Sequence, residues 1–163
     1  MRKAINILTV ILIALTMFGC SSNKPEPEKE NNISISEDIM ERKEIIAKEH
    51  IITTEDKTIY GNIYMPKEEG KYPAVILSHG YNGVNSDFIR ECSYFAENGY
   101  VAYAFDFCGG STRSKSSGFT TDMTLFSEKD DLLTVFENIS SLDNVDSERI
   151  FLFGASQGGM VSA

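Results

Sequence analysis

The chain of 163 residues has room for one domain, and its composition, 42% hydrophobic and 24% charged, is that of a globular protein. The net charge of −9 argues against nucleic acid as a partner. The three cysteines, Cys20, Cys92 and Cys108, are too few for a disulfide framework. Free thiols are the preferred interpretation of the last two, with a single bond between them outside the cell as the alternative.

The first twenty residues have the form of a lipoprotein leader. Arg2-Lys3 precedes an apolar run over residues 4–18, which is short of the roughly 20 residues of a membrane span. The run ends in Gly19-Cys20, which resembles the lipobox of bacterial lipoproteins, where the cysteine receives the lipid. We therefore expect a signal peptide over residues 1–19 and a lipid anchor on Cys20. The protein would then be exported and held on the extracytoplasmic face of a bacterial cell membrane. An ordinary secretory leader is the alternative.

Residues 20–40 are predicted to be a flexible tether. They are polar, charged and interrupted by Pro25 and Pro27, so they bury too little apolar surface to offset the entropy of ordering them. The folded domain is expected over residues 41–163.

The domain begins with two strand-like segments, Ile45–Thr53 and Thr58–Met65, joined by a turn at residues 55–57. In the second segment, residues 59, 61, 63 and 65 alternate with polar and aromatic neighbours, a period of two that is typical of a strand. The pattern predicts an antiparallel hairpin at the edge of a larger sheet.

Strands and helices alternate in the rest of the chain, which predicts a mostly parallel sheet covered on both faces, the α/β class. The expected elements are a strand at 72–78, a helix at 87–98 capped by Gly99, a strand at 100–105, a helix at about 125–140, a turn at 144–146 and a strand at 149–153. The inner face of the second helix is expected to carry Leu132, Val135, Phe136 and Ile139.

The last strand runs into Gly154-Ala155-Ser156-Gln157-Gly158, a G-x-S-x-G sequence that is followed by small and apolar residues beginning a helix. This strand, turn and helix context is that of a nucleophile elbow. A serine at so sharp a turn is held in a strained backbone conformation with its hydroxyl above the sheet. Glycine is needed at Gly154 and Gly158 because a larger side chain would collide with the neighbouring strand or helix.

Two further strands end in unusual sequence, His79-Gly80-Tyr81 and Asp106-Phe107-Cys108. With the Ser-Gln-Gly-Gly elbow and Met123-Thr124, they resemble the α/β-hydrolase superfamily, and within it the bacterial cinnamoyl/feruloyl-esterase-like serine hydrolases. The resemblance covers roughly residues 45–163. It implies Ser156 as nucleophile and the backbone N–H groups of Tyr81 and Gln157 as the oxyanion hole.

Other polar residues are expected to be structural. In the family that the chain resembles, the residue matching His79 shapes its loop and is not the base. Asp106 is expected to anchor the following loop, and His50 is expected to lie on the surface. Cys108 has no flanking base, so it is not expected to be a nucleophile. No Cys/His cluster has metal-ligand spacing, and no cofactor is expected.

In this superfamily the acid and the base follow the serine in the chain. Only seven residues follow Ser156, and both histidines precede it. We therefore expect an N-terminal fragment that lacks the triad acid and base, is inactive or nearly so, and leaves the strand before Ser156 as an open, apolar sheet edge prone to aggregation.

The expected function of the whole protein is that of a serine hydrolase, which cleaves small or plant-derived carboxylic esters through an acyl-enzyme. A peptidase of the same fold and a non-catalytic binding lipoprotein are the alternatives. The gene sequence beyond codon 163 separates them, because an Asp or Glu and then a His would favour an enzyme.

Overall fold

The computed structural model describes residues 42–163. The predicted signal peptide, Cys20 and the tether at residues 20–40 lie outside these residues. Within the described part of the chain, no helix is both long enough and apolar enough to cross a membrane.

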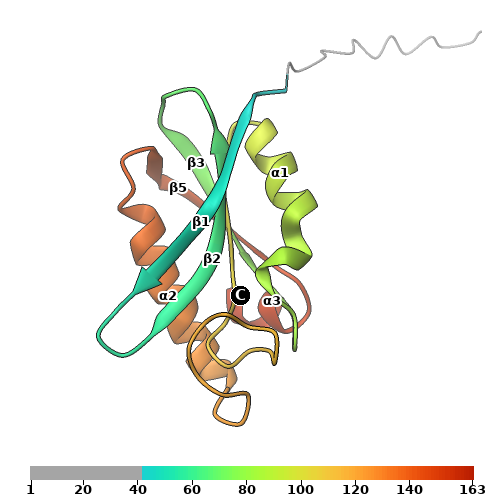
Figure 1. Ribbon diagram of the computed structural model, residues 1–163. Helices are drawn as coiled ribbons and strands as arrows, with labels where there is room; N and C mark the ends of the chain where they lie inside the picture. Colours follow the sequence, from blue (N-terminus) through green and yellow to red (C-terminus); the bar gives the residue numbers. More distant parts are fainter. Residues whose placement is uncertain (1–41) are drawn as a thin grey trace, which may run out of the picture. The chain divides into compact units, whose positions relative to one another are not determined.

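Five strands form one mixed sheet in the order β1-β2-β4-β3-β5 (Figure 1). The hairpin strands β1 and β2 are antiparallel, and β2 is antiparallel to β4, whereas β3 is parallel to both β4 and β5. The predicted α/β class, with its N-terminal antiparallel hairpin, is confirmed. The strands are β1 (Ile45–Thr53), β2 (Thr58–Pro66), β3 (Tyr72–Ser78), β4 (Val101–Phe105) and β5 (Val145–Gly154).

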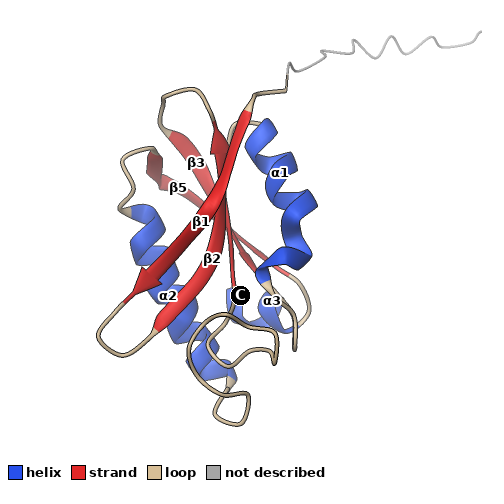
Figure 2. Cartoon of the chain, in the orientation of Figure 1, coloured by secondary structure: helices blue, strands red, loops and turns tan. Residues whose placement is uncertain are grey.

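Helices cover both faces of the sheet, as Figure 2 shows with α1 on one side and α2 on the other. The helical segments are a 3₁₀ turn, η1 (Asn85–Phe88), and the helices α1 (Ile89–Glu97), α2 (Leu125–Ser140) and α3 (Gln157–Ser162). The helix expected at residues 87–98 is therefore present as η1 and α1 together. Gly99 follows it with φ of 85°, a left-handed conformation that ends a helix at little cost for glycine.

The sheet separates two apolar cores because successive side chains of a strand point to opposite faces. In β3, Ala74 and Ile76 pack on the side of α2, where they join Val135 and Ile139. Val75 and Leu77 pack on the side of α1 with other buried side chains. Both faces of β3 are thus buried, which explains why this strand is a continuous apolar run and does not alternate.

The inner face of α2 differs from the prediction at one position. Phe136 is 38% exposed, whereas the carboxylates Glu128 and Asp131 are buried together with Leu132 and Val135. Glu128, Asp131, Leu132 and Val135 are spaced three, four and seven residues apart, so they share one stripe of the helix. The expectation for Phe136 was wrong because residues 132, 135, 136 and 139 also share a helical face, whereas the stripe that is buried is turned toward residues 128 and 131.

β5 begins earlier than predicted, since Val145 pairs with Tyr72 in the segment expected to be a turn. A turn-like irregularity does exist, but inside the strand: the register against β3 shifts between the pairs Tyr72–Val145 and Ala74–Ile150. Asp146 closes this bulge by accepting hydrogen bonds from the backbone N–H of Glu148 and the side chain of Arg149. The local polar sequence was therefore a bulge signal.

β5 is the last strand at its edge of the sheet. Its side chains Phe151, Leu152 and Phe153 are 52%, 41% and 38% exposed. The described residues thus have an open, apolar sheet edge at β5, as expected. Aggregation through this edge stays a prediction.

Cys92 and Cys108 are both free thiols. Cys92 belongs to the core beneath α1, and Cys108 packs against the core beneath α2. The sheet therefore separates them, and the preferred expectation of free cysteines is confirmed.

Candidate active site

The residues that follow β3, β4 and β5 lie together at the C-terminal ends of these strands. Ser78, the last residue of β3, is paired with Phe105 at the end of β4 and with Gly154 at the end of β5. Ligands of open α/β sheets bind beyond these C-terminal strand ends. The sequences His79-Gly80-Tyr81, Asp106-Phe107-Cys108 and Ala155-Ser156-Gln157 are thereby brought together.

Ser156 lies exposed between β5 and α3, with φ of 52° and ψ of −119°. These angles match the first central residue of a type II′ turn, a position that normally requires glycine. A Cβ at Gly80 would lie 3.2 Å from the Ser156 Cβ and 3.8 Å from its Oγ. The end of β3 therefore passes directly beside the serine side chain.

The glycines on either side of Ser156 allow this backbone to pack closely. A Cβ at Gly158 would lie 2.5 Å from the carbonyl oxygen of His79, closer than real Cβ atoms approach an oxygen. A Cβ at Gly154 would lie 2.5 Å from the backbone nitrogen of Gly159 in α3. Glycine at these positions holds the helix against the ends of β3 and β5.

The two backbone N–H groups that are predicted to form the oxyanion hole belong to Tyr81, which follows Gly80, and to Gln157, which follows Ser156. Around them, the backbone N–H of Asn82 donates to Gly110 in the loop after β4, and turns are closed by hydrogen bonds from Gly83 to Gly80 and from Gly158 to Ala155. Among the described residues, no hydrogen bond outside the regular helices and strands is donated by the N–H of Tyr81 or by that of Gln157. Both groups are therefore available to a ligand oxygen, and their role as an oxyanion hole stays a prediction.

The His79 imidazole is 2% exposed and uses both ring nitrogens. Nδ1 donates to the Gly80 carbonyl oxygen at 2.8 Å, and Nε2 accepts from the Phe107 backbone N–H at 3.1 Å. These partners fix the neutral Nδ1–H tautomer. Burial lowers the pKa of His79, which also favours the neutral ring. The ring joins the loops after β3 and β4, in agreement with a loop-shaping role.

Asp106 anchors its surroundings as expected. Its Oδ1 accepts hydrogen bonds of 2.7 Å from both the backbone N–H and the side-chain amide of Asn85. Its Oδ2 accepts from the backbone N–H of Lys115 at 2.8 Å. The carboxylate is buried and fully engaged in holding η1 and the loop at residues 106–121, so it is a structural group.

The Cys108 thiol is not activated. Burial raises its pKa to about 11, so it is a thiol at neutral pH. The backbone N–H of Cys108 donates to the carboxylate of the buried Asp131 at 2.8 Å, and the Lys57 ammonium forms an ion pair with the same carboxylate at 2.7 Å. This pair holds the loop to α2 and accounts for one buried carboxylate of that helix.

Sequence reasoning missed the second buried carboxylate. Glu128 accepts a hydrogen bond of 2.6 Å from the side-chain Nε2 of Gln157, the residue after the serine. The same Nε2 lies 3.6 Å from the Met123 sulfur. Burial raises the pKa of Glu128. The helical spacing of Glu128 with Leu132 and Val135 was the signal that could have found it.

A cavity of about 260 Å³ opens next to Tyr81, one of the two predicted oxyanion residues. It lies between the turn at Tyr81-Asn82 and the loop after β4, where Thr112, Thr120 and Met123 line it together with Gly109 and Gly110. The wall mixes hydroxyl, amide and thioether groups. Ser156 and Gln157 are not among the residues that line this cavity.

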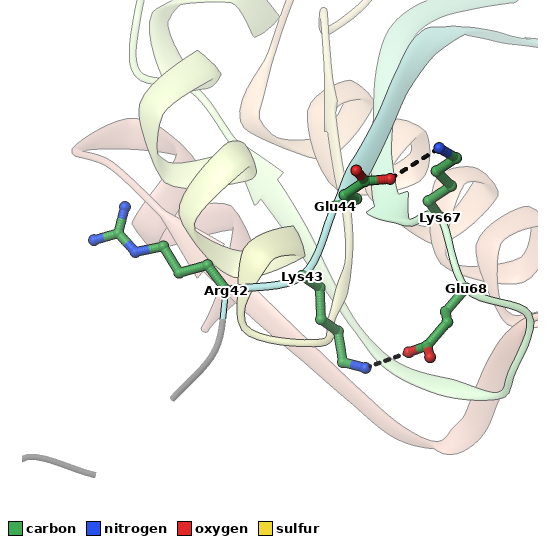
Figure 3. Close-up of a pocket in the computed structure, with 5 residues that line it drawn as sticks. All are labelled: Arg42, Lys43, Glu44, Lys67 and Glu68. Carbon is green, nitrogen blue, oxygen red and sulfur yellow. Dashed lines mark hydrogen bonds and ion pairs between the residues drawn. The ribbon is translucent and has the colours of Figure 1, made fainter. Parts of the chain in front are cut away.

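A larger hollow of about 660 Å³ lies elsewhere, beside the start of β1 and the end of β2 (Figure 3). Its charges pair with one another, Lys43 with Glu68 and Lys67 with Glu44, and these side chains are solvent-exposed. Residues 42–44 lie near Tyr72, which begins β3, so the hollow is at the sheet end opposite Ser156. It holds none of the groups that an acyl transfer needs.

Among residues 42–163, no group of three or more His, Cys, Asp and Glu side chains is arranged to hold a metal ion. His50 is not the exposed residue expected. It lies in β1, half-buried, with Nε2 2.7 Å from the Asn138 Oδ1 of α2 and its ring edge-on to Tyr103. Neither histidine of the chain is therefore positioned as a base for Ser156.

The comparison with known families decides the assignment. The profile of the acetyl xylan esterase (AXE1) family matches residues 48–163. The chain belongs to this family. The predicted resemblance to esterase-type α/β hydrolases is confirmed. The match spans every strand from β2 to β5 together with the elbow.

Individual relatives agree with the family. Acetyl esterase Axe7A of Xylanibacter ruminicola is 24% identical over 132 residues, 69% of this chain and 30% of the relative. Est1E of Butyrivibrio proteoclasticus, solved with ferulic acid bound, is 28% identical, with a TM-score of 0.60. The match covers 69% of this chain and 44% of Est1E. DcsB, solved with a substrate analogue, is 28% identical, with a TM-score of 0.62, and the match covers 72% of this chain and 39% of DcsB. The chain spans about a third of the length of the curated relatives it matches.

Proposed function

We propose that this chain carries the nucleophile and oxyanion hole of a serine carboxylic-ester hydrolase, within a longer polypeptide that supplies the triad base and acid. The observation that supports it best is Ser156, exposed at the β5–α3 turn with φ of 52° and directly beside the end of β3. Membership of the AXE1 family supports the same function.

In the proposed reaction, a base takes the Ser156 hydroxyl proton as Oγ attacks the ester carbonyl carbon. The negative charge that develops on the carbonyl oxygen is stabilised by the N–H groups of Tyr81 and Gln157. The carbon–oxygen bond to the alcohol then breaks, and the alcohol leaves with the proton from the base. Water, activated by the same base, hydrolyses the acyl-serine, and the carboxylic acid leaves as Ser156 regains its proton.

The substrate is proposed to be a small carboxylic ester, with an acetyl or small aromatic acyl group. The names of two relatives support an ester over a peptide, since one is an acetyl esterase and the other was solved with ferulic acid. The mixed polar lining of the cavity beside Tyr81 is compatible with either part of such an ester. Neither a peptidase nor a binding lipoprotein is favoured by an observation of its own.

A substrate panel tests this function. The longest polypeptide that the gene encodes is expected to hydrolyse p-nitrophenyl acetate and ethyl ferulate, and to leave p-nitroacetanilide intact. The 163-residue chain is expected to hydrolyse these esters no faster than buffer alone, because the rings of His50 and His79 are hydrogen-bonded to other groups. Fluorophosphonate labelling of this chain at the rate of an intact serine esterase would show that its expected inactivity is wrong. Cleavage of the anilide alone would favour a peptidase. Absence of turnover of all three substrates would favour a binding protein.

The membrane anchor is a second part of the proposal. The leader over residues 1–19 and Gly19-Cys20 support attachment of the protein by a lipid on Cys20 to the extracytoplasmic face of the cell membrane. Cys20→Ser is expected to abolish incorporation of labelled palmitate in a bacterial host and to release the protein from the membrane fraction. Cys92→Ser, a change at a buried free thiol, is the control for loss of a cysteine. Unchanged labelling of Cys20→Ser would contradict the anchor.

A further inference from the structure

Glu128 is a buried carboxylate whose side chain faces the nucleophile elbow. It is 1% exposed on the inner face of α2, and the described residues give its carboxylate one hydrogen-bond donor, the Gln157 Nε2 at 2.6 Å. The other buried carboxylate of the same helix, Asp131, is paired with Lys57 and a backbone N–H. Unlike Asp131, Glu128 has no cationic partner among residues 42–163, so the hydrogen bond from Gln157 is the main compensation for its burial.

Burial of a carboxylate is costly unless it is hydrogen-bonded, and a bond that involves an ionised group is roughly twice as strong as a neutral one. The upward shift of the Glu128 pKa reflects this burial, and the bond from Gln157 opposes the shift. The side chain of Gln157 is thus strongly favoured to remain on Glu128. On the same nitrogen, the Met123 sulfur at 3.6 Å adds a second contact.

Gln157 is the residue whose backbone N–H lies directly after Ser156. A side chain held at its far end restricts rotation of its own backbone, and hence the direction of this N–H. We propose that Glu128 is a positioning residue, which anchors the Gln157 side chain and so aims the Gln157 backbone N–H at the carbonyl oxygen of the bound ester. This inference rests on the proposed esterase function.

The kinetic test uses the longest polypeptide that the gene encodes, with p-nitrophenyl acetate as substrate. Glu128→Ala is expected to lower kcat by about tenfold, part of the hundredfold or more that follows full loss of an oxyanion donor. KM is expected to change little, because the donor acts mainly on the transition state. Glu128→Gln keeps an acceptor oxygen for Gln157 and a similar shape, so it is expected to recover most of the loss.

A double-mutant cycle separates positioning from a merely structural role. Gln157→Ala keeps the backbone N–H but loses the tether, so it is expected to lower kcat as much as Glu128→Ala. The double variant is expected to lose no more than either single one, because both changes remove the same bond. Glu137→Ala, a carboxylate on the exposed side of α2, is the matched control and is expected to leave kcat unchanged. Multiplying losses in the double variant, or a fall in melting temperature alone, would overturn the proposal.

A spectroscopic measurement keeps the test independent of turnover. In the 163-residue chain, Glu128→Ala is expected to shift the backbone and side-chain amide NMR resonances of Gln157, whereas Glu137→Ala leaves them in place. Unshifted Gln157 resonances in Glu128→Ala would refute the tether itself. Failure of the esterase function would instead appear as a wild-type rate equal to that of Ser156→Ala, with the Gln157 shifts still present.

Discussion

Replacement of Ser156 by alanine is expected to lower kcat for ester hydrolysis by about 10⁵-fold or more, as loss of a serine nucleophile does in other hydrolases. In the proposed mechanism Ser156 supplies the oxygen that forms the acyl-enzyme, and its side chain lies directly beside Gly80. The measurement is the rate of p-nitrophenyl acetate hydrolysis by the longest polypeptide that the gene encodes. Fluorophosphonate labelling should disappear in the same variant.

The matched control for this change is Ser147→Ala. Ser147 is an exposed serine of β5 in the bulge, far along the strand from the elbow, so its removal should leave hydrolysis and labelling intact. Retention of the wild-type rate by Ser156→Ala would exclude Ser156 as nucleophile, and with it the proposed mechanism.

The variant Gly158→Ala is expected to lower the free energy of unfolding by about 3 kcal/mol, the upper part of the range for overpacked sites. The new Cβ would collide with the Ser78 carbonyl oxygen at the end of β3 and lie 2.5 Å from that of His79, and both oxygens belong to backbone that has little room to move. Displacing α3 from β3 would also separate Ser156 from Gly80. Urea unfolding of the 163-residue chain, followed by circular dichroism, measures the loss.

Gly159→Ala provides the comparison for this stability prediction. Its Cβ would meet the Gly154 carbonyl oxygen at 3.2 Å, a much milder contact, and alanine favours a helix by about 1 kcal/mol over glycine. The two effects oppose each other, so a small net change is expected. Equal losses in the two variants would show that α3 tolerates no side chain at all, and that contact with β3 is not the cause.

The order of strands and helices could be predicted because it depends on local patterns. The period of two in β2, the unbroken apolar run of β3 and the G-x-S-x-G sequence each occupy a few neighbouring residues. The position of Ser156 beside Gly80 could be inferred only through resemblance to a known fold, since the two residues are far apart in the chain. Their proximity depends on the pairing of β3 with β5, which no local pattern records.

The polar framework around the site was predicted less completely. Asp106 was recognised as a loop anchor, but its partners Asn85 and Lys115 were not. Glu128 and Asp131 were not expected on the inner face of α2, whereas Phe136 was. Burial of these carboxylates depends on partners from distant segments, Gln157 for one and Lys57 for the other, so hydrophobicity alone misplaces them.

The left-handed backbone at residue 156 has a consequence for engineering. A residue other than glycine in such a conformation costs on the order of 1–2 kcal/mol, and the packing of Gly80, Gly154 and Gly158 must outweigh that cost. Glycine at position 156 would relieve it, so a library screened for heat resistance alone would favour variants without the hydroxyl. Thermostable versions of this protein should therefore be sought away from the elbow, with residue 156 held fixed.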